Sequence, residues 1–247
     1  VLFPPGTYAS TSQITVTGND VTLIGQGSAS LKYTGVMQTA NAGVLRVEGD
    51  RCRVENLTID GNTRLALYGV TVWQADGVKL RDVTVKTTGY HGLYLTASPN
   101  VTVDTVIMDD CGEPSRGNGF GGGMYASQCG DLAVINSTAS NCWDRGLYID
   151  GVGETGLLVA WCKSIGNGHS DSFRVSDARI VGHYVWGVDC TNVVGGRTGS
   201  LSIAAQSTFG NPARVIITGG VFGGSIPAGV DNEISITGDD VVFTGNT

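Results

Sequence analysis

The chain has 247 residues, 38 of them glycine and 6 of them proline, and carries a formal net charge of −7. This acidic balance argues against nucleic acid or an anionic membrane as the partner, and no apolar run is long enough to cross a bilayer. Glycine occurs at about twice its ordinary frequency, which is typical of a fold with many tight turns.

The chain opens with short strands. Residues 1–8, 14–16 and 21–24 are apolar segments separated by glycine-, proline- and asparagine-rich turns, which predicts three strands. No signal peptide is visible before them. Because a first strand without a covering coil would expose unpaired edges, we expect the natural chain to begin earlier or another domain to cover this end, and the end at Thr247 is equally abrupt.

Two columns of apolar pairs repeat along residues 50–178. The pairs of the first column are 26, 23, 31 and 25 residues apart: Cys52/Val54, Val78/Leu80, Val101/Val103, Leu132/Val134 and Leu157/Val159. The second column comprises Val70/Val72, Leu93/Leu95, Met124/Ala126, Leu147/Ile149, Phe173/Val175 and Leu201/Ile203. Because the columns advance nearly in step, each period is one closed coil, which predicts an all-β, single-stranded parallel β-helix of about eight coils.

A polar corner column follows the first strand of each coil: Asn56, Asp82, Thr105 and Asn136. Stacked polar side chains at a corner can satisfy backbone groups of the turn from one coil to the next. We expect residues 1–205 to form the coils and residues 206–247 to form less regular coils or the start of a following segment.

The six cysteines form no pattern typical of a zinc site or a disulfide framework. Cys111 and Cys142 occupy the same position on adjacent coils, so they should lie about 5 Å apart. They are either two buried thiols or a disulfide bridge. The acidic residues are too widely spaced to hold calcium, so neither a metal nor another cofactor is expected.

The opening string VLFPPGTYASTSQITVTGNDVTLIGQG resembles the first coil of the pectate-lyase-like proteins. This superfamily of parallel β-helices includes pectate lyases, polygalacturonases, alginate epimerases and bacteriophage tailspikes. The resemblance implies right-handed winding over roughly residues 1–205 and a carbohydrate substrate. The catalytic motifs of these enzymes are absent. Polygalacturonases carry an Asp-Asp after a glycine, a Gly-His-Gly and an Arg-Ile-Lys. Here Asp109-Asp110 is followed by Cys-Gly, His91 lies in Tyr-His-Gly, and no Arg-Ile-Lys occurs. No catalytic residue is transferred from the family.

Polar residues converge at the corner before the last strand of each coil. Aligning Gly92, Gly146 and Ser172 places residues from several coils in one column, and an insertion at residues 112–123 lengthens the same turn. The candidate catalytic residues are Asp144, Asp171, Glu113 and His169, and the candidate substrate-binding residues are Tyr90, His91, Arg116, Trp143 and Arg145.

Each candidate has a chemical role. Carboxyl groups one coil apart, at about 4.8 Å, approach the separation of about 5–5.5 Å in retaining glycosidases, so Asp144 with Asp171 or Glu113 could act as acid and base. Alternatively, a histidine removes the proton next to a uronate carboxyl in a lyase or epimerase. Arginines would hold a substrate carboxylate and the aromatic residues would stack on sugar rings. The alternative for the same residues is a solvated turn, which is where Asp/Arg neighbours more often occur.

These observations leave three hypotheses. The first is a tailspike-type β-helix that either binds or both binds and cleaves bacterial surface polysaccharide. Such a protein would be a homotrimer in the virion tail. The second is a secreted, monomeric polysaccharide lyase, glycoside hydrolase or uronate epimerase that uses the same corner. The third is a structural β-helix without catalytic activity.

Overall fold

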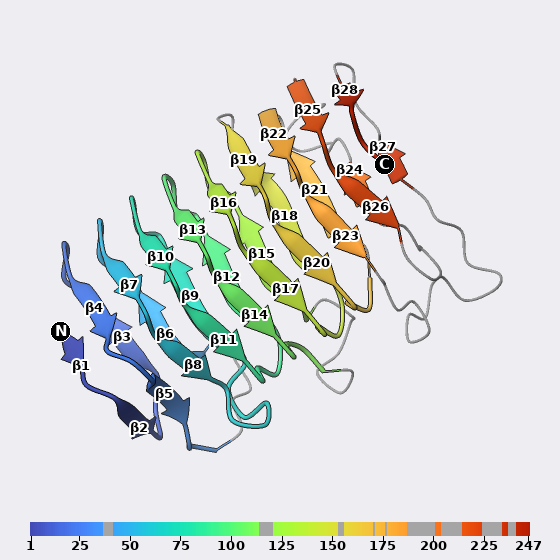
Figure 1. The fold of residues 1–247 in the computed structure, drawn as a ribbon. Helices are drawn as coiled ribbons and strands as arrows, with labels where there is room; N and C mark the ends of the chain where they lie inside the picture. The colour runs from blue at the N-terminus through green and yellow to red at the C-terminus, as the bar shows by residue number, and fades with distance from the viewer. Residues whose placement is uncertain are drawn as a thin grey trace.

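The structure, a computed structural model, describes residues 1–36, 42–113, 121–152, 156–169, 171–175, 177–186, 201–203, 214–223, 234–236 and 241–247. These residues form strands and turns, and no helix occurs among them. Figure 1 shows the strands stacked in coils, with the two ends of the chain at opposite ends of the stack. The predicted all-β parallel β-helix is confirmed.

Each coil contributes one strand to each of three parallel sheets. The first sheet contains β1 (Leu2–Phe3), β4 (Thr22–Gly25), β7 (Arg53–Glu55), β10 (Lys79–Arg81), β13 (Thr102–Asp104), β16 (Ala133–Ile135), β19 (Leu157–Ala160), β22 (Asp177–Val181), β25 (Arg214–Thr218) and β28 (Val241–Thr244). The second contains β2 (Gly6–Ser10), β5 (Ala29–Tyr33), β8 (Thr58–Asp60), β11 (Thr84–Lys86), β14 (Ile107–Asp109), β17 (Thr138–Ser140), β20 (Lys163–Ile165), β23 (Tyr184–Trp186) and β26 (Val221–Gly223).

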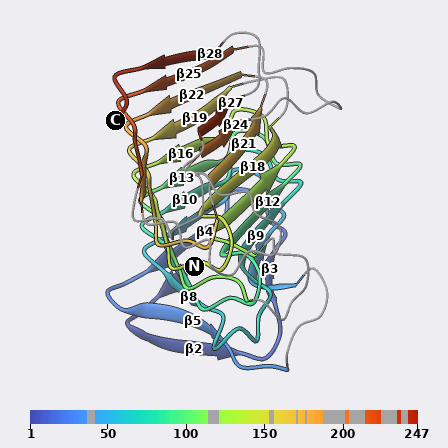
Figure 2. The same cartoon turned by 90° about the vertical axis from the view of Figure 1, so that its right-hand side faces the viewer.

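The third sheet contains β3 (Ile14–Val16), β6 (Gly43–Val47), β9 (Tyr68–Trp73), β12 (Leu93–Thr96), β15 (Met124–Ser127), β18 (Leu147–Val152), β21 (Asp171–Val175), β24 (Leu201–Ile203) and β27 (Ile234–Ile236). In Figure 2 the first and third sheets form two separate faces of the stack. Within 206–247, β25 to β28 extend all three sheets, and the remaining residues of this stretch lie outside the described part of the chain.

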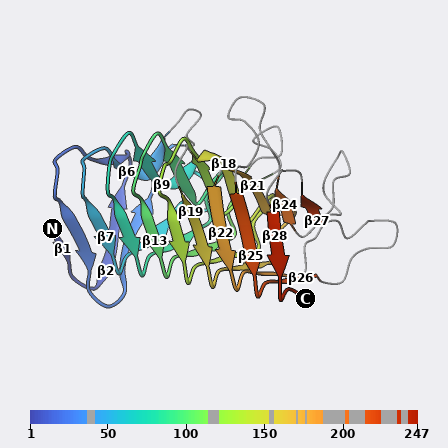
Figure 3. The ribbon, with the colours of Figure 1, turned by 90° about the horizontal axis from the view of Figure 1, so that it is seen from above.

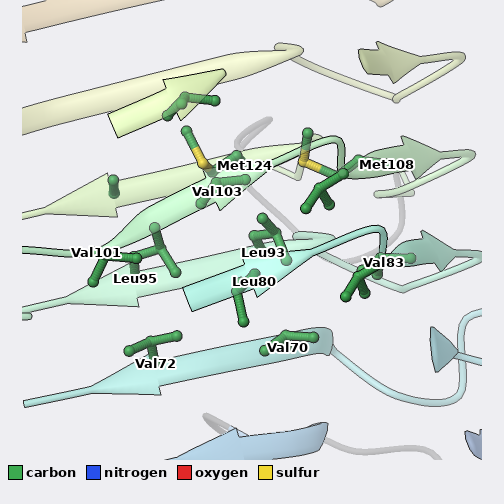
Figure 4. Close-up of a cluster of buried hydrophobic side chains, with 14 of the residues drawn as sticks. Val70, Val72, Leu80, Val83, Leu93, Leu95, Val101, Val103, Met108 and Met124 are labelled. Atoms are coloured by element: carbon green, nitrogen blue, oxygen red, sulfur yellow. The ribbon is translucent and has the colours of Figure 1, made fainter. Parts of the chain in front are cut away.

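The apolar columns line the inside of the coils. Leu80 pairs in register with Val54 on one side and with Val103 on the other. Leu93 likewise pairs with Val70 and with Met124. All of these side chains are fully or almost fully buried, and Figure 4 shows valine, leucine and methionine side chains from neighbouring coils in contact within the interior. Like side chains therefore stack on like, which is the reason that the sequence repeats.

The corner column between the first and second sheets is also confirmed. Asn56, Asp82, Thr105 and Asn136 all adopt a left-handed backbone conformation, with φ of 54°, 52°, 55° and 51°. Asparagine and aspartate tolerate this conformation better than most residues do. The backbone N–H of each one donates to a backbone carbonyl of the next coil, so these four N–H groups are satisfied by the backbone and not by the side chains.

The described cysteines are buried thiols rather than bridges. Cys52, Cys111, Cys129, Cys142 and Cys162 are all free. Cys111 and Cys142 lie on adjacent coils as expected, and their thiols interact with one another. Of the two alternatives for this pair, the structure has the unbridged one.

Candidate functional site

The corner between the second and third sheets carries most of the predicted site residues. Residues 87–92, 141–146 and 166–170 make short connections there, whereas residues 110–123 make a long one between β14 and β15. The insertion therefore lies where the sequence predicted it. Glu113, at its start, is half-buried, and Arg116 lies outside the described residues.

Asp144 is the most perturbed carboxyl group of this corner. It is only 4% exposed, and Arg145 Nη1 donates to its Oδ2 at 3.0 Å. Burial raises the pKa of Asp144 to about 6, although the Arg145 charge and its hydrogen bond act in the opposite direction. Desolvation outweighs the ion pair here because Asp144 is almost fully buried. A carboxyl group that exchanges its proton near neutral pH is suited to general acid–base chemistry.

Tyr90 and His91 precede β12 and lie near Asp144. Tyr90 is half-buried, and its pKa is raised by burial and by the negative charge of Asp144. It therefore keeps its proton and can donate a hydrogen bond. His91 is 2% exposed, and its Nδ1 accepts a hydrogen bond from Gly122 N at 3.2 Å. Burial, with a smaller effect of Arg145, lowers the pKa of His91 to about 3, so the imidazole is neutral. Its ring stacks on Tyr125 at a centroid distance of 5.4 Å.

The insertion rejoins the stack between these two groups of residues. Gly122 lies so close to the neighbouring coil that a Cβ built on it would be 2.1 Å from the Arg145 carbonyl oxygen. Gly121 O accepts a hydrogen bond from Asp144 N at 2.9 Å. The glycines of the GGG segment therefore allow the backbone to approach Asp144 and His91 closely enough to bury both.

A shallow hollow of about 220 Å³ lies beside Trp143 at the same corner. It is lined by Arg64, Gly112, Asn141, Cys142, Trp143, Gly166 and Gly168. Arg64 reaches from the connection before β9 to the start of the insertion, where Nε donates to Gly112 O at 3.0 Å and Nη2 contacts Asp110 Oδ1 at 2.5 Å. At this hollow the half-buried Trp143 lies next to Gly112, the residue that precedes Glu113 in the chain.

The structure does not place Asp171 with this group. Asp171 is 0% exposed and accepts hydrogen bonds from Leu147 N (2.8 Å) and Ser164 Oγ (2.9 Å), while its Oδ2 lies 2.8 Å from His183 Nε2. The alignment of Ser172 with Gly146 is wrong, because Ser172 pairs with Tyr148, two positions further along the chain. Asp171 is the first residue of β21 and alternates with the buried Phe173 and Val175. Asp171 thus takes an inward position on β21, where it cannot meet a glycan outside the coils.

His169 does reach the corner, two positions away from its expected alignment with Trp143. It forms a parallel bridge with Arg145, and its backbone N–H donates to Asp144 O at 3.0 Å. It is only 8% exposed. Of the predicted residues, the structure thus brings Tyr90, His91, Asp144, Arg145 and His169 together around one corner.

A row of tyrosines on the outward face of the third sheet was missed. Tyr94 pairs with Tyr125, and Tyr125 pairs with Tyr148. The ring centroids of these pairs are 5.6 Å and 5.1 Å apart. The Arg145 guanidinium lies 4.7 Å from the centroid of Tyr148, so the tyrosine row adjoins Asp144. The signal was present, because a tyrosine separates the two apolar residues of three successive pairs.

The described residues contain no group of three metal-binding side chains, and no helix among them is long and apolar enough to span a bilayer. The arrangement around Asp144 thus offers an acid–base carboxyl group, a cation and aromatic rings.

Solved structures with this fold include a pectate lyase, a viral protein and a tailspike protein. Pectate lyase Pel9A superposes with a TM-score of 0.69 at 14% identity, covering 100% of this chain and 69% of its own. The ORF18 protein of Geobacillus virus E2 gives a TM-score of 0.64 at 19% identity, over 92% of this chain. The Dettilon tailspike protein gives 0.61 at 11% identity, over 100% of this chain. Identities this low show a shared fold alone.

The chain spans 50% of the Geobacillus virus protein and 60% of the tailspike protein. No curated protein resembles the sequence closely enough to count as a match. The family described as "right handed beta helix region" matches residues 42–192, which is more than half of the chain. This match confirms the right-handed winding and the resemblance stated above, and the chain belongs to the right-handed β-helix family.

Proposed function

We propose that this chain is the carbohydrate-directed β-helix of a tailspike-type protein, and that it binds and cleaves bacterial surface polysaccharide at the corner around Asp144. The observation that carries the proposal is the buried carboxyl group of Asp144, whose pKa is raised to about 6 beside Arg145 and the tyrosine row. Asp144 lies at the corner beside Arg145 and the tyrosine row, whereas the buried Asp171 lies inside the coils.

In a hydrolase, protonated Asp144 would donate its proton to the glycosidic oxygen as the bond to the sugar breaks. A second carboxylate would act as nucleophile or activate water, and Glu113 is the remaining candidate on the neighbouring coil. Tyr90 and the tyrosine row would contact the sugar rings, and Arg145 would hold an acidic substituent.

The interior position of Asp171 favours a second candidate, a polysaccharide lyase or uronate epimerase, because it removes one of the two predicted carboxyl groups from the corner. Ionised Asp144 would then remove the proton next to the uronate carboxyl, and Arg145 would neutralise that carboxylate. In a lyase the bond to the leaving oxygen breaks, a carbon–carbon double bond forms, and Tyr90 would protonate the leaving oxygen. In an epimerase a proton returns to the opposite face of the same carbon.

The experiment is to incubate the chain with capsular, pectic and alginate polysaccharides. New reducing ends without ultraviolet absorbance indicate hydrolysis, both signals together indicate elimination, and altered NMR anomeric signals without cleavage indicate epimerisation. The pH profile separates the roles of Asp144: activity falls as the pH rises through about 6 if it acts as an acid, and increases if it acts as a base.

Two variants test the assignment. Asp144→Asn should abolish turnover while retaining binding, whereas Asp104→Asn, on the outward face of the first sheet, should leave both unchanged. Full activity in Asp144→Asn would show that the corner is not the site. Binding without turnover by the unmodified chain would leave a recognition module, and neither binding nor turnover would favour the structural β-helix.

We further propose that the protein acts as a homotrimer in the virion tail, since its fold relatives include a viral protein and a tailspike. Light scattering of the purified chain measures the mass in solution. A stable trimer supports this assembly, and a monomer would favour the secreted enzyme.

A further inference from the structure

The first sheet carries a hollow of about 380 Å³ on its outward face, away from the third sheet and its tyrosine row. It lies over β4, β7 and β10 and is lined by Asp20, Thr22, Arg51, Arg53, Gly77 and Lys79. Figure 3 shows how the strands of this sheet lie side by side along the stack. Three of the six lining residues are basic, in a chain whose net charge is −7.

One of the three basic residues is already neutralised. Arg51 Nε and Nη2 donate to the two carboxylate oxygens of Asp20, each at 2.8 Å. Asp50 and Asp76 also act on the charge of Arg51, and with Asp20 they raise its pKa. These two carboxylates belong to the turns, where Asp50 accepts Asp76 N at 2.9 Å and Asp76 accepts Asn100 Nδ2 at 2.8 Å.

The other two basic residues face each other without a counter-charge. Lys79 pairs in register with Arg53, so like charges lie on adjacent strands. The backbones of these strands are about 4.8 Å apart. Neither side chain makes a hydrogen bond or an ion pair with another residue of the described chain. Like charges directly opposite one another on a sheet destabilise it. Thr22, in register with Arg53 on its other side, adds a hydroxyl group.

The neighbouring row of the same face is arranged differently. Two residues further along the strands, Arg81 pairs with Glu55 on one side and with Asp104 on the other, so the charges alternate. The sheet therefore compensates charge in one row and leaves the adjacent row with an excess of positive charge inside a hollow. A bound anion would supply the negative charge that Arg53 and Lys79 lack.

We propose that this hollow binds an oxyanion, namely a carboxylate, sulfate or phosphate group carried by an acidic glycan. Arg53 presents a planar fork of donors that matches an oxyanion bidentately, and Lys79 adds a point charge on the same face. Thr22 supplies a neutral donor at the edge. The hollow shares no residue with the corner around Asp144. Oxyanion binding therefore does not depend on catalysis there, whereas the glycan as carrier of the oxyanion rests on the proposed function.

The test measures thermal unfolding and calorimetric binding of the whole chain in sodium acetate, sulfate and phosphate, with sodium chloride at matched ionic strength as reference. At least one oxyanion should raise the unfolding temperature above the chloride value, and the arm that does so identifies the group. Lys79→Gln and Arg53→Gln should each weaken that binding at least about tenfold, because each removes a charge-assisted contact.

Two further readings decide the interpretation. Lys79→Gln should unfold at a higher temperature than the unmodified chain in low salt, since it relieves the repulsion that the anion otherwise relieves. Arg81→Gln, from the alternating row, should keep the oxyanion effect and gain no stability. The proposal is overturned if no oxyanion exceeds chloride, or if Arg81→Gln loses as much binding as Lys79→Gln does.

Discussion

Removing the Asp171 carboxylate should destabilise the fold strongly. In Asp171→Ala, Leu147 N–H, Ser164 O–H and His183 Nε2 lose a partner in a fully buried place. Leaving one buried polar group unsatisfied costs about 1–3 kcal/mol, and Asp171→Ala leaves three such groups without their partner. Since the three groups can partly relax, we expect a loss of about 3–5 kcal/mol, a large fraction of the stability of a typical domain.

The assay is denaturant unfolding followed by circular dichroism and tryptophan fluorescence. The matched control is Asp177→Ala, because Asp177 is exposed at the start of β22 and should change the unfolding free energy by less than about 0.5 kcal/mol. Asp171→Asn should be intermediate, since its amide oxygen can still accept from Leu147 N–H. If Asp171→Ala were as stable as the control yet lost glycan turnover, Asp171 would belong to the chemistry after all, and the structural reasoning would be refuted.

The remaining predictions concern Asp144, Gly122 and the thiols. Burial raises the pKa of Asp144 from 3.8 to about 6, so its contribution to stability is present below about pH 4 and is lost as the pH rises through 6. The total loss is about 2–3 kcal/mol. Asp144→Asn should flatten that part of a curve of unfolding free energy against pH. An unchanged curve would contradict the burial argument. Gly122→Ala, which places a Cβ 2.1 Å from the Arg145 oxygen, should destabilise by about 1–3 kcal/mol, whereas Gly156→Ala, with its nearest contact at 3.5 Å, should be tolerated in the same unfolding assay. Cys111 and Cys142 should resist a thiol reagent in the native chain and react after denaturation, with cysteine-specific peptide mapping as the readout, because both are buried and free. Rapid native labelling would show that the coil opens there.

The coil architecture could be predicted from the sequence because the interior of a solenoid repeats. Leu80 lies on Val54 and under Val103, so each coil demands an apolar residue at the same place, and the period becomes visible along the chain. The corner at Asn56 and Asn136 was visible for a similar reason, since its left-handed backbone favours few residue types. The tyrosine row could have been predicted from the same columns.

The site depended on contacts that no period reveals. Asp171 alternates with the inward residues Phe173 and Val175 on β21, so its inward position follows from the strand period. Its hydrogen-bond partners Leu147 and His183 lie on neighbouring coils, and no period reveals them. The pKa of Asp144 is raised because the backbone of the insertion and the neighbouring coils exclude water from it. A repeat specifies which residues occur once per coil, whereas desolvation and strand register depend on how closely two particular coils meet, and that is a property of the folded stack.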